Sequence, residues 1–158
     1  MKTLLVAGLL SSALLSPARF ASAAGWDTRV GKVHACPGVP ASRCIQVFSV
    51  ASTTRWRDCL ACLPHRTVTA MSRDDIAIQI DVAREHPQRG QSTFTWPARV
   101  KRDQVVAGFE GLPPRISTWQ GHTRIGTREV SVFVLFGRAR PTERQLQRAN
   151  AELRRVRL

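Results

Sequence analysis

The sequence lacks the short motifs that mark the common enzyme classes. Its 158 residues contain no G-x-S-x-G, no H-E-x-x-H and no phosphate-binding glycine motif. These absences exclude the familiar sites of serine hydrolases, zinc proteases and P-loop nucleotide hydrolases. Tyrosine is absent as well, and no internal repeat is visible. The adjacent carboxylates Asp74 and Asp75 predict a turn and not a catalytic pair, because neighbouring residues of a strand point to opposite faces.

Long apolar runs are missing beyond the N-terminus. The run at residues 4–15 follows a basic residue and precedes small residues at 21–24, which is the layout of a cleaved secretory signal. It is too short to cross a bilayer about 30 Å thick. No cysteine follows it until Cys36, so a lipid anchor is not expected. The sequence therefore predicts a signal peptide at 1–24 and a single secreted, extracytoplasmic domain at 25–158, which does not span the membrane once the signal is removed.

Acidic residues are scarce. The chain has 24 Lys and Arg against 11 Asp and Glu, a net charge of +13. Without the predicted signal, 22 basic residues face 11 acidic ones, so the net charge is +11, and nearly all of it comes from arginine. Such a charge predicts attraction to anions outside the cell, either an anionic wall polymer or lipid headgroups. A protein partner is also compatible with it, and we predict no specific nucleic acid.

Cysteines are few but concentrated, since all four lie within residues 36–62. In a small exported domain their simplest interpretation is two structural disulfides. The four residues are Cys36, Cys44, Cys59 and Cys62. The spacing leaves all three pairings open. The longer loops of a nested pairing would gain about 1 kcal/mol per bond at most, and native geometry can reverse that gain.

The spacing Cys59-Leu60-Ala61-Cys62 also fits a redox-active pair. In such a pair a lowered pKa makes one thiol a reactive thiolate, and Arg57 would supply positive charge nearby. Against this hypothesis, Pro64 limits any following helix, and no strand–helix–strand pattern leads into the motif.

A mixed cysteine and histidine zinc site is the third interpretation. Its candidate ligands are His34, Cys36, Cys44, Cys59, Cys62 and His65. The seven residues between Cys36 and Cys44 are too many for a usual zinc knuckle, and an oxidising compartment works against free thiolates. Haem attachment fits less well still, because its motif needs a histidine directly after the second cysteine and two residues separate Cys62 from His65. We therefore expect no metal and no cofactor.

Alternating apolar residues predict several strands. The clearest is 75–82, where isoleucines alternate with smaller or polar residues, as in a half-buried strand. A β-like run at 67–71 precedes it across a turn, which predicts a hairpin. The segment 129–136 is apolar on both faces and predicts a central strand. The interval 85–103 is polar and predicts a long surface connection. Further extended segments are expected at 44–50, 105–109 and 115–121.

The C-terminal residues 142–157 predict an amphipathic helix. Thr142 and Gln145 have the spacing of a capping box. Apolar residues then recur at helical spacing on one face, namely Leu146, Ala149, Leu153 and Val156.

Together these elements predict an α+β fold. We expect a small, mostly antiparallel sheet with the C-terminal amphipathic helix packed on one face, pinned by disulfides in the N-terminal segment 25–65. The closing segment EVSVFVLFGRARPTERQLQRANAELRRVRL, with 75–82 and 108–111, resembles small exported domains of unassigned function in high-GC Gram-positive bacteria. The resemblance covers about two thirds of residues 25–158 and implies an α+β fold without an activity.

We therefore expect an exported, non-enzymatic bacterial protein, a basic domain that binds an anionic envelope component or a protein partner. The alternative hypothesis is a thiol–disulfide oxidoreductase that uses Cys59 and Cys62. The candidate binding surface consists of helix arginines and two tryptophans, although tryptophans in so small a domain also fit the core. These residues are Arg144, Arg148, Arg154, Arg155, Trp96 and Trp119.

Overall fold

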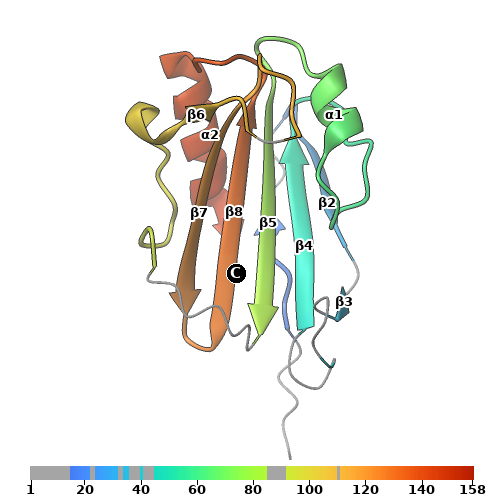
Figure 1. Ribbon diagram of the computed structural model, residues 1–158. Helices are drawn as coiled ribbons and strands as arrows, with labels where there is room; N and C mark the ends of the chain where they lie inside the picture. The colour runs from blue at the N-terminus through green and yellow to red at the C-terminus, as the bar shows by residue number, and fades with distance from the viewer. Residues whose placement is uncertain are drawn as a thin grey trace, which may run out of the picture.

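A computed structural model describes residues 15–21, 24–31, 34–35, 40, 45–84, 92–109 and 111–158 of the chain. One antiparallel sheet dominates it, with the strand order β2-β4-β5-β8-β7-β6, and β3 also pairs with β4 (Figure 1). A second, two-stranded sheet joins β1 to β9. The elements are β1 (Arg19–Phe20), β2 (Asp27–Val30), β3 (His34–Ala35), β4 (Ile45–Ser52), α1 (His65–Ala70), β5 (Ile76–Arg84), the 3-10 turn η1 (Arg102–Gln104), β6 (Val106–Ala107), β7 (Ser117–Ile125), β8 (Arg128–Phe136), α2 (Glu143–Arg155) and β9 (Val156–Arg157).

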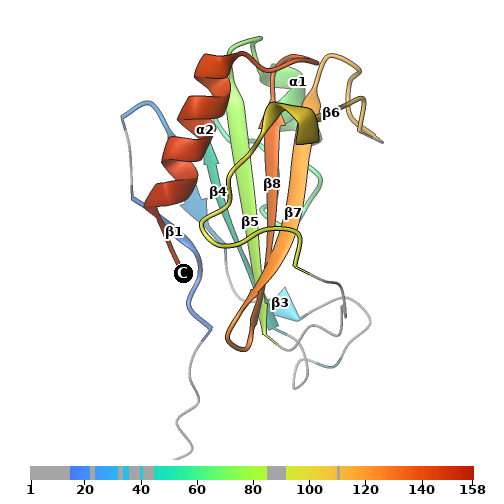
Figure 2. The ribbon, with the colours of Figure 1, turned by 90° about the vertical axis from the view of Figure 1, so that its left-hand side faces the viewer.

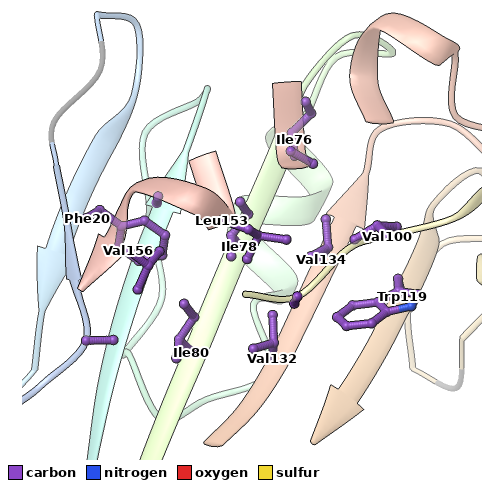
Figure 3. Packing of buried hydrophobic residues seen from close by; sticks show 14 of the residues in the cluster. Phe20, Ile76, Ile78, Ile80, Val100, Trp119, Val132, Val134, Leu153 and Val156 are labelled. Carbon is purple, nitrogen blue, oxygen red and sulfur yellow. The ribbon is translucent and has the colours of Figure 1, made fainter. Parts of the chain in front are cut away.

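The main core lies between the sheet and α2. Ile78 of β5 and Val134 of β8 are completely buried there, together with Leu153 of α2 (Figure 3). The predicted apolar stripe of the helix is buried, and the central position predicted for 129–136 is confirmed, because β8 pairs with both β5 and β7. A mostly antiparallel sheet with a C-terminal helix is thus what the sequence predicted, although the sheet is a larger part of the fold than expected.

The start of α2 is fixed by its capping box. The Thr142 hydroxyl accepts the backbone N–H of Gln145 at 3.2 Å, and the Gln145 side chain accepts the backbone N–H of Thr142 at 3.0 Å. The Gln145 amide also donates to the backbone carbonyl of Arg73 at 3.0 Å. The cap therefore anchors the helix to the turn before β5, and the helix begins after Thr142 as predicted. The predicted end at residue 157 is wrong, because α2 ends at Arg155 and Val156 and Arg157 pair with β1 as strand β9.

The other face of the sheet carries a smaller core under α1. Figure 2 shows α1 and α2 on opposite sides of the sheet. Buried residues of this second core are Val50, Trp56, Val68, Met71, Ala77, Leu112, Ile116 and Leu135. The prediction that β5 is only half-buried is wrong at Ala77, whose side chain lies under this second layer.

The predicted hairpin at 67–71 is wrong, because this segment belongs to α1. The β-branched residues Thr67 and Val68 favour a strand locally, but hydrogen bonds at both ends of the segment favour a helix. At the N-terminal end, the Asp58 carboxylate accepts the backbone N–H of Thr67 at 2.7 Å. At the other end, Arg115 donates to three carbonyls at the end of the helix and just after it. Tertiary contacts thus override the local preference.

The predicted surface connection at 85–103 is described from residue 92, and part of it is buried. Ala98 and Val100 are 2% and 3% exposed and belong to the main core. The backbone of Val100 exchanges two hydrogen bonds with the Asn150 side chain of α2, at 2.7 and 3.0 Å. The described part of this connection, residues 92–103, therefore lies beside α2, and we call it the strap.

A short N-terminal segment also packs on the core. Arg19 and Phe20 form β1, which pairs antiparallel with Arg157 and Val156 of β9. Ala18 is completely buried, and Phe20 is 9% exposed beside Val156 (Figure 3). These residues lie within the predicted signal peptide, so its removal would take away one strand and two core side chains.

Candidate functional sites

The cysteine segment contains a local disulfide. Cys59 and Cys62 are bonded to each other, with their Cα atoms 5.2 Å apart, in the loop between β4 and α1. This excludes the nested pairing, which would have joined Cys59 to Cys44. Cys36 and Cys44 lie outside the described residues. Both Cys59 and Cys62 are exposed, so the disulfide is accessible from solvent.

The surroundings of this disulfide differ from those of a redox motif at the start of a helix. Cys59 lies in a turn, and α1 begins only after Pro64. The loop is held by the Gln79 side chain, which donates to the carbonyl of Leu60 at 2.8 Å. An apolar groove of about 200 Å³ lies beside Cys62, lined among others by Leu63, Phe109 and Phe133. The disulfide thus combines exposure with an adjacent apolar surface.

The predicted binding arginines lie on the outer side of α2. Arg144, Arg154 and Arg155 are exposed, and Arg148 lies over the Trp26 ring with its guanidinium carbon 6.0 Å from the ring centre. The strap adds two exposed basic residues next to the helix, and β9 adds one at its end. We call the whole set the α2 basic face, made up of Arg99, Lys101, Arg144, Arg148, Arg154, Arg155 and Arg157.

The two acidic residues of α2 do little to balance this charge. Glu143 is exposed and pairs at 3.4 Å with Arg102, which lies outside the set. Glu152 is completely buried and contacts Arg155 at 3.4 Å, while one of its carboxylate oxygens lacks a hydrogen-bond partner. Burial raises the pKa of Glu152 despite the neighbouring Arg155.

The two predicted tryptophans do not belong to this face. Trp119 is 5% exposed and lies in the main core, where its indole N–H donates to Gln104 at 3.3 Å. Trp96 is partly buried against the same core, and Phe94 lies between the two rings, with ring centres 6.3 and 5.6 Å away. The tryptophans are therefore structural, and the candidate surface reduces to its basic residues.

A third site was not predicted from the sequence. Asp81 of β5 pairs in register with Ser131 of β8, and Ser131 pairs with His122 of β7. Since neighbouring strands lie roughly 4.8 Å apart, these three residues form one row across the sheet. All three line a hollow of about 450 Å³ on the sheet face opposite α2, together with Glu129 and Phe133. We call this hollow the sheet-face pocket.

Two atoms in this row have no hydrogen-bond partner. They are Oδ1 of Asp81 and Nε2 of His122, and both are buried. Burial raises the pKa of the Asp81 carboxyl from 3.8 to about 7. A carboxyl without donors in such a place is unusual, because buried polar groups are normally hydrogen-bonded. The nearby carboxylate Glu129 is satisfied by an ion pair with Arg124.

Other kinds of site are not formed by the described residues. Within them, no three His, Cys, Asp or Glu side chains are grouped so as to hold a metal ion. Asp74 and Asp75 lie in and beside a turn, as predicted, and the Asp75 carboxylate accepts hydrogen bonds from Thr53 and Ser72. No helix in the described ranges has the length and apolarity needed to span a membrane.

Comparison with known proteins gives no match, whether to a family model, to a curated protein or to a solved structure.

Proposed function

We propose that this protein is an exported, non-enzymatic binding domain whose α2 basic face binds an anionic polymer of the cell envelope. The observation that carries the proposal is the set of seven basic residues on α2, on the strap next to it and on β9, six of them exposed and Arg148 half-buried. Arginines held on a rigid helix bind phosphate and carboxylate groups with several hydrogen bonds each. The secretory layout of residues 1–24 supports the location.

A polymer suits this face better than a lipid bilayer. Helices that lie in a membrane surface insert exposed apolar side chains between the headgroups. The apolar stripe of α2 is already buried in the core. The large exposed hydrophobics among the described residues are Val30, Leu63 and Val106, and none of them is on α2. A charged helix of 13 residues, roughly 20 Å long, instead matches several repeats of an extended anionic chain.

The test is binding of the purified protein to a phosphodiester wall polymer at several salt concentrations. We expect affinity to fall steeply between about 50 and 500 mM salt, because the screening length shortens over this range. A variant with Arg144, Arg148 and Arg154 changed to Gln should bind about 100-fold more weakly, at about 1 kcal/mol per basic residue.

The matched control is a variant with Arg55, Arg57 and Arg66 changed to Gln. These three arginines are exposed and lie outside the α2 basic face. Because three arginines are replaced in each variant, the change in net charge is the same. Equal losses in both variants would show that only net charge matters and would overturn the assignment to α2. Stronger binding to anionic vesicles than to the polymer would favour a lipid surface instead.

A second candidate function is thiol–disulfide exchange by Cys59 and Cys62. It is supported by the exposure of their disulfide and by the apolar groove beside Cys62, on which an unfolded substrate could lie. The reduction potential decides this question. A value below about −300 mV is typical of structural disulfides and would exclude the exchange activity, whereas a value near those of known oxidants would support it.

A further inference from the structure

The sheet-face pocket is built by strand register and not by a loop. Asp81, Ser131 and His122 are consecutive partners across β5, β8 and β7, three strands of the sheet interior. Their backbones are held by continuous strand pairing, so the spacing of the row is fixed by the sheet itself. The pocket lies on the face opposite α2, and it is therefore independent of the α2 basic face.

The row presents acceptor atoms to the pocket, and Oδ1 of Asp81 and Nε2 of His122 meet no donor there. The ionised Asp81 carboxylate accepts only, the Ser131 hydroxyl can accept, and the unpartnered ring nitrogen of His122 can accept when the imidazole is neutral. Arg124 of β7 is a basic side chain on this face, and its guanidinium is already paired with Glu129. A group with several N–H donors is what this row lacks.

The walls of the pocket favour a positively charged donor. Phe133 lines the pocket on β8, two residues from Ser131, and an aromatic face attracts cations. Among the described residues, Asp81 and Glu129 are the carboxylates at the pocket, and a carboxylate repels an anionic ligand. A cation next to Asp81 would supply both the missing hydrogen bonds and the missing counter-charge.

We propose that the sheet-face pocket binds a small organic cation, a protonated amine or guanidinium, whose N–H groups are accepted by Asp81, Ser131 and His122. The volume of about 450 Å³ lies in the range of small-molecule sites. The row spans roughly 10 Å between the outer strands, so a planar guanidinium, or an amine with a short chain, fits its width.

Calorimetric titration with four matched probes tests the class of ligand. The probes are agmatine, butylamine, neutral butanol and anionic butyrate. We expect saturable binding of agmatine and butylamine, at least tenfold tighter than that of butanol or butyrate. No saturable binding of either cation up to millimolar concentration, or butanol binding as tight as butylamine binding, would overturn the proposal.

Substitutions locate the site. Asp81→Asn keeps the shape but removes the charge, and it should weaken agmatine binding at least tenfold, while Ser131→Ala should weaken it less. The control is Asp103→Asn, an exposed carboxylate in η1 with the same change of charge. Equal affinities of wild type and Asp81→Asn would overturn the site. Circular dichroism of each variant distinguishes lost binding from lost folding.

Binding should also depend on pH. Among the described residues, the charged and titratable groups on this sheet face near Asp81 are His122, Arg124 and Glu129, and the latter two form an ion pair. Affinity for agmatine should therefore rise as Asp81 ionises through pH about 7, where burial places the pKa of its carboxyl. The rise should be much smaller in Asp81→Asn, and a rise of the same size in this variant would contradict the role of Asp81.

Discussion

The buried carboxyl of Asp81, which meets no donor at Oδ1, lowers the stability of the ligand-free protein once it is ionised. Burial raises the pKa of its carboxyl from 3.8 to about 7. Between these two pH values the folded protein keeps a proton on Asp81 that the unfolded chain has released. The stability that this group contributes is complete below pH about 4 and is lost as the pH rises through about 7. A pKa difference of this size between the folded and unfolded chain lowers the free energy of unfolding by at most about 4 kcal/mol.

The substitution Asp81→Asn should therefore stabilise the protein at pH 8 and change little at pH 4. Urea unfolding at both pH values measures the difference. Asp103→Asn serves as the control, because Asp103 is exposed. A variant at Asp81 that is no more stable than wild type at pH 8 would show that the buried carboxyl has donors in solution.

The residues that form the sheet-face pocket could not be identified from the sequence. Ser131 and His122 are 9 positions apart across the hairpin of β7 and β8, but Asp81 is 50 positions from Ser131. Only the register of β5 with β8 brings them together. The available signal was a polar residue inside an apolar strand. Asp81 interrupts Ile80 and Val82, and Ser131 interrupts Val130 and Val132.

Among the secondary-structure elements, α2 was the most predictable, because its signals are local. The capping residues Thr142 and Gln145 are three positions apart, and the apolar stripe repeats within one helix. The element α1 was not predictable, because the groups that stabilise it come from elsewhere. Asp58 lies before it in the chain, and Arg115 lies more than 40 residues after it.

Removal of the cap should weaken α2 and the core beneath it. Thr142→Ala loses the hydrogen bond to the N–H of Gln145 and should cost about 1 kcal/mol, which lowers the melting temperature by a few degrees. Thr142→Ser keeps an acceptor and should restore most of the loss. The control Thr127→Ala changes an exposed threonine in the β7–β8 turn, and an equal loss there would contradict the role of the cap.

For the whole molecule, residues 15–21 should contribute to the free energy of unfolding. Phe20 packs in the main core beside Val156, and β1 pairs antiparallel with β9. A protein that begins at residue 25, after the predicted cleavage site, should be less stable than one that begins at residue 15. The loss of a buried Phe alone costs about 3 to 5 kcal/mol. Urea unfolding of both proteins, and of Phe20→Ala in the longer one, measures this contribution. Equal stability of all three would show that β1 adds nothing to the core.

The pairing of β1 with β9 also bears on how the chain assembles. Its register joins Arg19 to Arg157, so the contact closes a loop of nearly the entire polypeptide. Contacts between such distant positions form late, because much chain entropy is lost before any contact energy is gained. A ribosome must therefore release almost the whole chain before this pair can form. The same proximity means that a short linker could join residue 19 to residue 158, with new ends opened at the Gly126 turn between β7 and β8, and the sheet would keep its strand order.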